Sequence, residues 1–423
     1  MPSSSVRRLA FLTVLLPCMA QADTPPFLQL LQVLRDNGTI NAEAYTALRQ
    51  SALADTSTAP AQSPAPVIAA AAPAAASDKS GETAKPSSPP ANAWTQNVRI
   101  GGDLRYRHEM IGVENGADLT RHRIRARLDV TGRVTDAVSA GFKLSTGGDD
   151  PVSGNQTLGG GLSRKEFGVD QAYFRWQPVK GTTIIGGKFA TPFVRAGNHP
   201  LIFDGDLNPE GLAVSHASET WFANAAGYWI QERQGAPDSL MLGGQIGIKR
   251  TVDGVGIVTG VSYYDYVNAC GQAPFFTTSR KGNTLVGGRY ANDFNLVEAF
   301  GELEFKAAGR PLRFFGSYVN NVAADRFGDG YALGITYGKA SASNTWEIGY
   351  AYQDLAADSV IGIFTDSDFG GGGTDNHGHV IRLAYALSPN WGLHLTYFNN
   401  EVCGNAGTAH GYQRLQADVN FKF

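Results

Sequence analysis

Seven arginines in two short stretches are the residues of this sequence whose spacing most clearly suggests a chemical role. They share one alternation, so a β-strand in each stretch places all its charges on one face. A permanently charged guanidinium row in contact with water attracts anions. For any single residue, a merely solvated charge is the alternative that stays open. The first stretch holds Arg99, Arg105 and Arg107, and the second holds Arg121, Arg123, Arg125 and Arg127.

Other groups with chemical potential lack a supporting pattern. Asp366, Asp368, Asp375, His377 and His379 are of metal-binding types, but their spacing matches neither an EF-hand nor a zinc site. A glycine-rich external loop explains this composition, so we expect no metal.

The histidines come with no Gly-x-Ser-x-Gly elbow. We therefore expect no catalytic residue, no enzyme activity and no cofactor. Cys270 and Cys403 leave two alternatives open, a disulfide in an oxidising compartment or two free thiols in loops.

The first 22 residues predict export. Arg7 and Arg8 precede an apolar run, and Ala20-Gln21-Ala22 forms an A-x-A cleavage site. The mature chain carries slightly more acids than bases and no long basic run, so we expect no nucleic-acid partner.

Residues 23–54 have helical spacing interrupted at Asn37-Gly38, which predicts a periplasmic helical hairpin. It could trimerise, bind a periplasmic partner or act as a spacer. Residues 55–93 are almost entirely Ala, Pro and Ser, a composition typical of a disordered linker.

From Trp94 to the C-terminus the apolar pattern has a period of two. This predicts an all-β domain of about sixteen strands over residues 94–423. The first two strands are expected at about 98–108 and 121–134. The others are expected at 138–144, 172–176, 183–189, 212–216, 221–232, 240–248, 255–266, 297–305, 312–320, 331–337, 346–352, 381–387, 391–397 and 412–423, with the two strands between 212 and 232 the least certain in their bounds.

Connections alternate between tight turns, such as 135–136 and 388–390, and long loops. Short turns at one rim and long loops at the other are typical of a transmembrane antiparallel β-barrel. The long loops are expected at 109–120, 146–166, 190–211, 267–295 and 355–378.

The number of strands decides which face meets lipid. Sixteen strands enclose a lumen too wide to fill with their own side chains, so the apolar face must point outward. Turning the faces over would place seven arginines in hydrocarbon at roughly 2 to 4 kcal/mol each near the midplane. Aromatic residues toward strand ends predict interfacial girdles, namely Tyr106, Trp176, Phe189, Trp229, Trp346, Trp391, Tyr412 and Phe423.

Four stretches resemble the family described as putative porin, of Gram-negative outer membranes. They are GNQTLGGG at 154–161 with SRKEFGVDQAYFRW after it, GGKFATPF at 186–193, FDGDLNPEGLA at 203–213 and FTDSDFGGGGTDNHGH at 364–379. The resemblance covers roughly residues 94–423. It implies a sixteen-stranded, water-filled channel that forms a homotrimer in contact with outer-membrane lipid and lipopolysaccharide. The C-terminal Phe423 also looks like the end of the signal read by the outer-membrane assembly machinery.

A distant similarity to general porins implies that the third long loop, 190–211, folds inward and narrows the pore. That loop region holds Asp204, Asp206 and Glu210. The arginine row would stand across the lumen, together with Arg175 and Lys188. Opposed acid and base would then set up a transverse field at a selective constriction.

These observations predict a porin for passive diffusion of small hydrophilic solutes or ions. Two alternatives belong to other classes: a barrel whose loops bind a ligand or surface, and a barrel hydrolase.

Overall fold

The computed structural model describes residues 97–405 and 408–423, and eight residues nearer the N-terminus (32, 35, 42, 43, 45, 46, 49 and 50). Those eight have helical backbone. The signal peptide, most of the expected hairpin and the Ala/Pro linker lie outside the described residues, so these assignments stay predictions.

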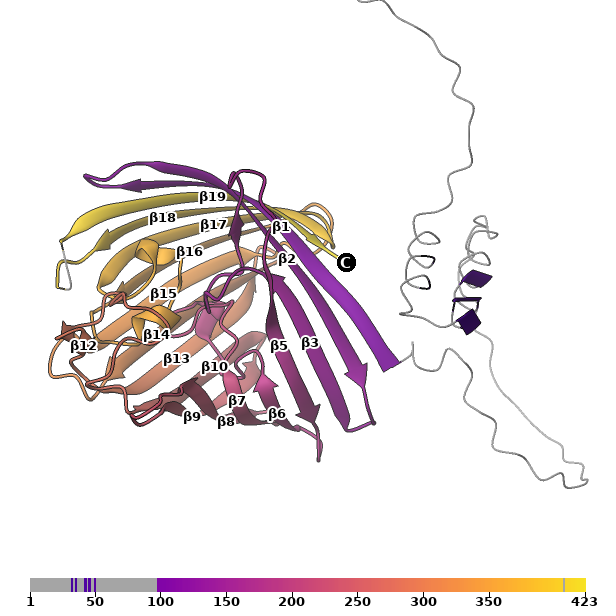
Figure 1. The fold of residues 1–423 in the computed structure, drawn as a ribbon, viewed down its shortest axis with the longest axis horizontal. Helices are drawn as coiled ribbons and strands as arrows, with labels where there is room; N and C mark the ends of the chain where they lie inside the picture. Colours follow the sequence, from indigo (N-terminus) through magenta and orange to yellow (C-terminus); the bar gives the residue numbers. More distant parts are fainter. Residues whose placement is uncertain are drawn as a thin grey trace, which may run out of the picture. The chain divides into compact units, whose positions relative to one another are not determined.

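Sixteen antiparallel strands close into a barrel (Figure 1). Each pairs with the next along the chain, and the first closes on the last, with Asp103 opposite Lys422 and Val113 opposite Tyr412. The strands are β1 (Val98–Val113), β2 (Leu119–Arg133), β3 (Val138–Thr146), β5 (Phe167–Trp176), β6 (Thr182–Lys188), β7 (Glu210–Ala217), β8 (Trp221–Gln231), β9 (Ser239–Val252), β10 (Val255–Val267), β13 (Phe294–Ala307), β14 (Arg310–Asn321), β15 (Asp329–Gly338), β16 (Thr345–Leu355), β17 (Asn376–Ser388), β18 (Trp391–Val402) and β19 (His410–Lys422).

Minor elements lie in the long connections. The two-residue β4 (Gln156–Thr157) pairs with β2, and β11 (Leu285–Val286) pairs with β12 (Arg289–Tyr290). Single 3₁₀ turns occur at η3 (Ala196–Asn198), η4 (Gly362–Phe364) and η5 (Phe369–Gly371). Within the described part of the chain, no helix is both long enough and apolar enough to cross a membrane.

Short turns and long loops alternate as expected. Asp253-Gly254 joins β9 to β10 with φ of 51° and 81°, the left-handed pair that suits a two-residue hairpin turn. The expectation of a long loop at 109–120 was wrong. The strand β1 continues to Val113 and β2 begins at Leu119, so only a short connection joins them.

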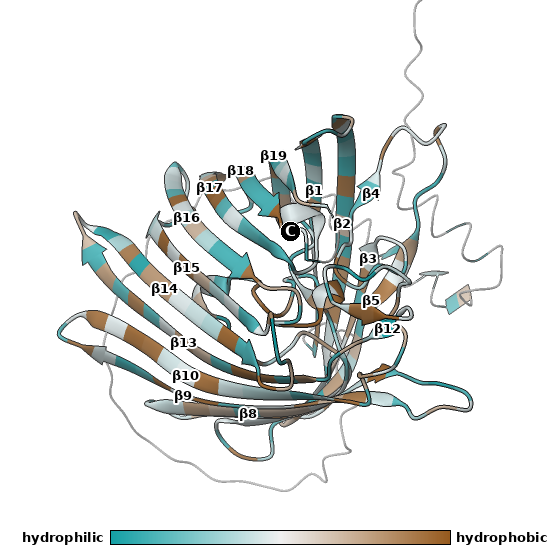
Figure 2. Cartoon of the chain, turned by 90° about the vertical axis from the view of Figure 1, so that its left-hand side faces the viewer, coloured by the Kyte–Doolittle hydropathy of each residue, from teal (hydrophilic) through white to brown (hydrophobic). Residues whose placement is uncertain are grey.

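The two faces of the strands divide as predicted. On β1 the apolar Ile100, Leu104 and Met110 point outward, whereas Arg107 and Glu109 are buried inside the barrel. Figure 2 shows the hydropathy alternating along the strands, as this division requires. The prediction of an interfacial position was wrong for two residues, because Phe189 and Tyr412 are buried on the inside of the barrel.

The interior is partly filled by a hydrophobic core. Inward-facing Tyr228, Met241, Tyr264 and Leu296 of β8, β9, β10 and β13 are almost fully buried. They pack against apolar residues of the connections 189–209, 268–293 and 356–375, including Phe193, Phe203, Phe275 and Phe364. The inner face of these strands is therefore apolar where the connections cover it, while β1, β2 and β19 keep a charged inner wall.

Candidate functional site

The connection between β6 and β7, residues 189–209, contacts inward-facing residues of the barrel wall. Gln245 of β9 holds Val194 through both backbone atoms, accepting from N at 2.8 Å and donating to O at 3.0 Å. Two strands further along the barrel wall, Glu302 of β13 accepts a hydrogen bond from the Gly197 amide at 2.6 Å. This connection, the third-loop segment, is thus fixed to the barrel wall at several points.

Residues 356–375, between β16 and β17, also fold inward. The expectation of a glycine-rich external loop here was wrong, since Ala357, Val360 and Ile361 are fully buried. The Asp204 amide donates to the Phe364 carbonyl at 2.7 Å, so this second segment packs directly on the third-loop segment. We call residues 356–375 the inner segment.

Glycine is required where the inner segment meets the connection 268–293. Gly373 has φ of 103°, and a Cβ built there would lie 2.4 Å from the Lys281 carbonyl oxygen. Asn283, which is fully buried, donates to the Ala357 and Val360 carbonyls at 2.7 and 2.8 Å and accepts from the Gly362 amide. The glycine-rich sequence therefore permits close packing inside the barrel.

Most of the arginine row lies on the inner wall in contact with carboxylates. Arg107 is bound by Asp418 at 2.7 Å and by Asp368 of the inner segment at 3.1 Å. Arg121 is bound by Glu109 at 2.5 Å, and Glu109 also binds Arg414, a residue of β19 that the sequence interpretation did not include. The β1–β19 closure creates this contact, and no local pattern in the sequence indicates it.

The third-loop segment reaches the row itself. Asp206 lies 2.9 Å from Arg125 and 3.4 Å from Arg127, and both arginines also bind Asp103. The expected acid and base do not stand across an open gap at this point, since Asp206 and these two arginines form contact ion pairs. The field at this level is therefore weaker than separated charges would give.

Arg105 and Arg123 are the exceptions in the row. Arg105 Nη2 donates to Asn155 Oδ1 at 2.6 Å, and Arg123 Nη2 donates to the Asn155 carbonyl oxygen at 3.2 Å. Among the described residues, neither has a carboxylate within ion-pair distance. Arg99 and Arg175, which are exposed, lie toward the ends of β1 and β5 near the short-turn rim, away from this level.

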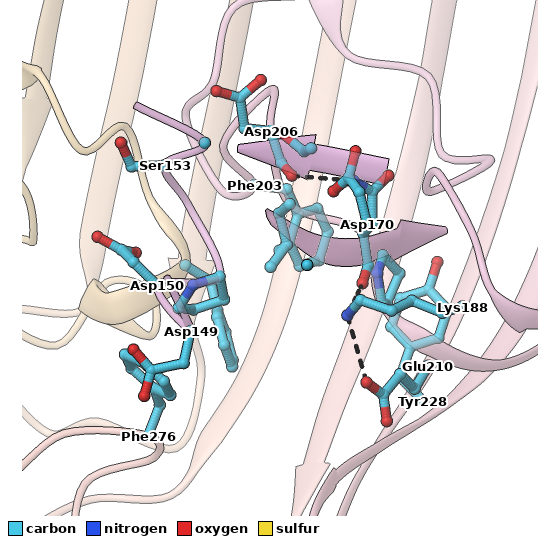
Figure 3. A pocket seen from close by; sticks show the side chains of 18 of the residues that line it. Asp149, Asp150, Ser153, Asp170, Lys188, Phe203, Asp206, Glu210, Tyr228 and Phe276 are labelled. Atoms are coloured by element: carbon cyan, nitrogen blue, oxygen red, sulfur yellow. Dashed lines mark hydrogen bonds and ion pairs between the residues drawn. The ribbon is translucent and has the colours of Figure 1, made fainter. Parts of the chain in front are cut away.

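A cavity of about 400 Å³ lies between this wall and the inward segments (Figure 3). Asp149 and Asp150 stand at one side of it, and Lys188 and Glu210 at the other. Lys188 binds Glu210 at 3.2 Å and donates to the Asn208 carbonyl at 2.9 Å. Arg127 and Asp206 also line the cavity, so the predicted pore residues meet here in part.

The sequence profile of the family described as putative porin matches residues 112–286 and 290–423. That is well over half of the chain. The chain belongs to the putative porin family. It is an outer-membrane β-barrel channel, and no curated protein matches its sequence.

Solved structures similar to this porin are outer-membrane proteins. OprB of Pseudomonas putida is 11% identical, with a TM-score of 0.54 over 78% of this chain and 95% of that one. A mutant of Rh. blastica porin has 12% identity and a TM-score of 0.47, over 77% and 100% of the two chains. Vibrio cholerae OmpT in its trimer form has 12% identity and a TM-score of 0.45, over 77% and 99%. The likeness to OprB supports the porin fold.

Two carboxyl groups meet where the inward segments of the porin touch. Asp204 accepts from the Ser367 amide at 3.0 Å, and burial together with the charge of Asp366 raises its pKa to about 8. Burial and the charge of Asp368 also raise the pKa of Asp366. Asp368 behaves oppositely, because Arg414 and Arg107 outweigh its burial and lower its pKa.

Glu298, Glu302 and Glu304 of β13 also face the inside of the barrel, but not all of them face the open lumen. Glu298 is buried and accepts from Ser262 and Ser317, both at 2.8 Å. Glu302 holds Gly197, and Glu304 binds Arg313 at 2.6 Å. Glu302 thus holds the third-loop segment, whereas Glu298 accepts hydrogen bonds from residues of β10 and β14.

The structure separates the metal-type side chains of residues 366–379. Asp368 binds arginines inside the barrel, while His377 contacts Cys403 at 3.3 Å and His379 contacts Tyr350 on the outer face. The disulfide alternative was wrong: Cys270 and Cys403 are free thiols on different loops, with Cys270 near the Ala291 carbonyl.

Proposed function

We propose that this porin is a passive-diffusion channel whose aqueous path runs along the charged wall of β1, β2, β3 and β5. The observation that carries the proposal is the 400 Å³ cavity, which Arg127 of β2 and residues of β3, β5 and β6 line beside the inward segments. Charged side chains line part of it, and apolar residues such as Tyr228, Met241 and Phe275 line another part. Small hydrophilic solutes and ions fit a path of this kind, whereas apolar solutes are disfavoured.

The third-loop segment and the arginine row together form the proposed selectivity zone. Contact pairs of Asp206 with Arg125 and Arg127 support it, because they fix the width of the path at that level. Arg105 and Arg123, which have no carboxylate partner among the described residues, leave excess positive charge beside them, while Asp149 and Asp150 offer negative charge at the cavity wall. The balance predicts weak anion selectivity at the row.

Planar-bilayer recording of the purified protein tests the channel. Under a salt gradient we expect discrete ohmic steps and a reversal potential displaced toward the anion. Silence from folded, heat-modifiable protein would instead favour the alternative of a closed barrel whose loops bind a ligand or surface.

The thiol–imidazole contact of Cys403 with His377 argues against a cysteine hydrolase. His377 Nδ1 lies 3.3 Å from Cys403 Sγ, and Glu401 lies 3.9 Å from the other ring nitrogen. Burial and the carboxylates of Asp375, Asp354 and Glu401 raise the pKa of the Cys403 thiol to about 11. Since the thiolate is the nucleophile, this cysteine is poorly suited to catalysis.

We also infer a homotrimer, with protomers meeting at the outer face of β1 and β2. His108 and His122 point outward there, and His122 bonds the Tyr106 hydroxyl at 2.7 Å. Polar rings are unfavourable against hydrocarbon, so a neighbouring protomer is a better environment for them than lipid. Light scattering of the detergent-solubilised protein should give three protomers per particle. Lipopolysaccharide contacts and recognition of Phe423 during assembly belong to the same proposal.

A further inference from the structure

Arg105 and Arg123 differ from every other arginine on the inner wall of β1 and β2 above the short-turn rim. Arg107, Arg121, Arg125 and Arg127 each contact at least one carboxylate within 3.5 Å. Arg105 and Arg123 contact none among the described residues, although both are more than half buried. The other four arginines of this part of the wall stabilise the fold through ion pairs. Within the described part of the chain, Arg105 and Arg123 make no such contribution, so their charge is available to a ligand.

The two guanidinium groups converge on one residue. In the β1–β2 register Arg105 lies opposite Arg125, and Arg123 lies opposite Arg107, which makes Arg105 and Arg123 diagonal neighbours on the same face. Both donate to Asn155, one to its side-chain oxygen and one to its carbonyl oxygen. Asn155 belongs to the connection 147–166, which also lines the cavity through Ser153 and Gly154.

Asn155 satisfies these groups incompletely. The Nε atoms of Arg105 and Arg123 are buried and make no hydrogen bond with the described residues. Arg125 and Arg414 also have an unpaired Nε, but each of those side chains is ion-paired through its Nη atoms. Unused donors on an unpaired guanidinium are costly to bury, so a ligand with several acceptor atoms would stabilise this place.

We propose that Arg105 and Arg123 form an oxyanion subsite in the channel, which binds the carboxylate or phosphate group of an anionic solute as it passes. Guanidinium groups bind both through paired, charge-assisted hydrogen bonds. Asn155 is a neutral hydrogen-bond acceptor for both guanidinium groups. The acceptor atoms of the solute replace its oxygens when the solute binds. This inference rests on the proposed channel function and names its solute class.

The test is block of the chloride current by two probes, succinate and inorganic phosphate, in single-channel recordings. We expect a saturable reduction of the current by at least one probe in the wild-type protein. Replacing both arginines, as Arg105→Gln with Arg123→Gln, should raise the half-blocking concentration by about tenfold or more, since hydrogen bonds to charged groups are lost. Block by succinate alone identifies a carboxylate site, by phosphate alone a phosphate site, and by both a general oxyanion site.

Two further variants separate binding from net charge and from misfolding. Lys180→Gln with Lys249→Gln removes the same two charges at exposed positions near the short-turn rim and should keep the block. Asn155→Asp places a fixed carboxylate between the guanidinium groups and should abolish the block while the arginines and the barrel remain. Conductance without block in the wild type, or equal block in the Arg105/Arg123 variant, overturns the inference. An absence of conductance contradicts the channel function instead.

Discussion

At the scale of single residues, the inner wall of β1 and β2 holds four arginines paired with carboxylates and two, Arg105 and Arg123, that have no such partner among the described residues. The parity of the sequence correctly predicted that the arginines face the lumen. It could not predict their partners, because Asp418 and Glu109 pair across the barrel closure and Asp206 and Asp368 arrive on inward segments. Pairing of this kind depends on tertiary contacts between residues far apart in the chain.

The Arg125–Asp206 contact predicts a compensating pair of substitutions. Arg125→Gln should shift the reversal potential toward cations, and Asp206→Asn should shift it toward anions. The double variant should lie close to the wild type, because the opposite charges are removed together. Reversal potentials of the four proteins in one salt gradient check this; a double variant that stays as far from the wild type as either single variant would contradict the compensation.

The Asp204 carboxyl group predicts a pH dependence of the contact between the inward segments. Its folded pKa is raised from 3.8 to about 8, so the packed form binds a proton that the released form loses. The contribution of Asp204 to the contact is therefore full below about pH 4 and is lost as the pH rises toward 8. His199 has the opposite pH dependence, because burial lowers its pKa to about 3. The neutral imidazole favours packing at pH values above its ordinary pKa, and this contribution is lost as the pH falls.

Hydrogen exchange of residues 362–375, corrected for intrinsic rates, isolates the Asp204 effect. Between pH 5 and pH 8.5 the wild type should lose more protection than Asp204→Asn does. The matched control Asp149→Asn, an exposed aspartate of another connection, should follow the wild type. Identical pH profiles for Asp204→Asn and the wild type would contradict the assignment. Arg195, Arg382 and Arg414, with Asp206, Asp366 and Asp368, are the other charged groups that act on this contact.

At the scale of elements, the strands were predictable and the inward segments were not. Period-two alternation and turn residues predicted all sixteen strands, with bounds that were mostly too short. The FTDSDFGGGGTDNHGH stretch reads as an external loop from its glycines alone. Its folding inward depends on Asn283, Phe275 and Asp204, which belong to two other connections.

Asn283 predicts how firmly the inner segment is held. Asn283→Ala leaves the Ala357 and Val360 carbonyls and the Gly362 amide without this partner in a buried place, at about 1–3 kcal/mol for each unsatisfied group. The segment should loosen while the barrel persists, so the single-channel current should become larger or noisier. Asn390→Ala, in the exposed β17–β18 turn, is the control. A steady wild-type current from a folded Asn283→Ala protein would show that the segment does not limit the path.

At the scale of the whole molecule, strand number decided which face meets lipid, and the structure agrees. The same argument predicted a wholly aqueous lumen, which is only partly right. Several inward residues of β8, β9, β10 and β13, such as Tyr228, Met241 and Leu296, are apolar and packed against the inward segments. Alternation in the sequence cannot distinguish an apolar inner face from a misplaced strand end. The distinction depends on which segment of the chain covers that face.

The lipid-facing assignment predicts different tolerance at two nearby positions of β15. Leu333 points outward and is exposed, while Thr336 has the opposite parity. Leu333→Lys should destabilise the folded barrel by about 2–4 kcal/mol if it lies near the midplane, whereas Thr336→Lys should cost little. Urea unfolding in lipid vesicles measures both; equal losses would contradict the orientation of the barrel wall.

Single-channel recording under a salt gradient is the sharpest test of an open, charged path through the partly filled barrel. We expect discrete ohmic steps with a reversal potential displaced toward the anion. Folded protein that inserts into the bilayer and passes no current would contradict it.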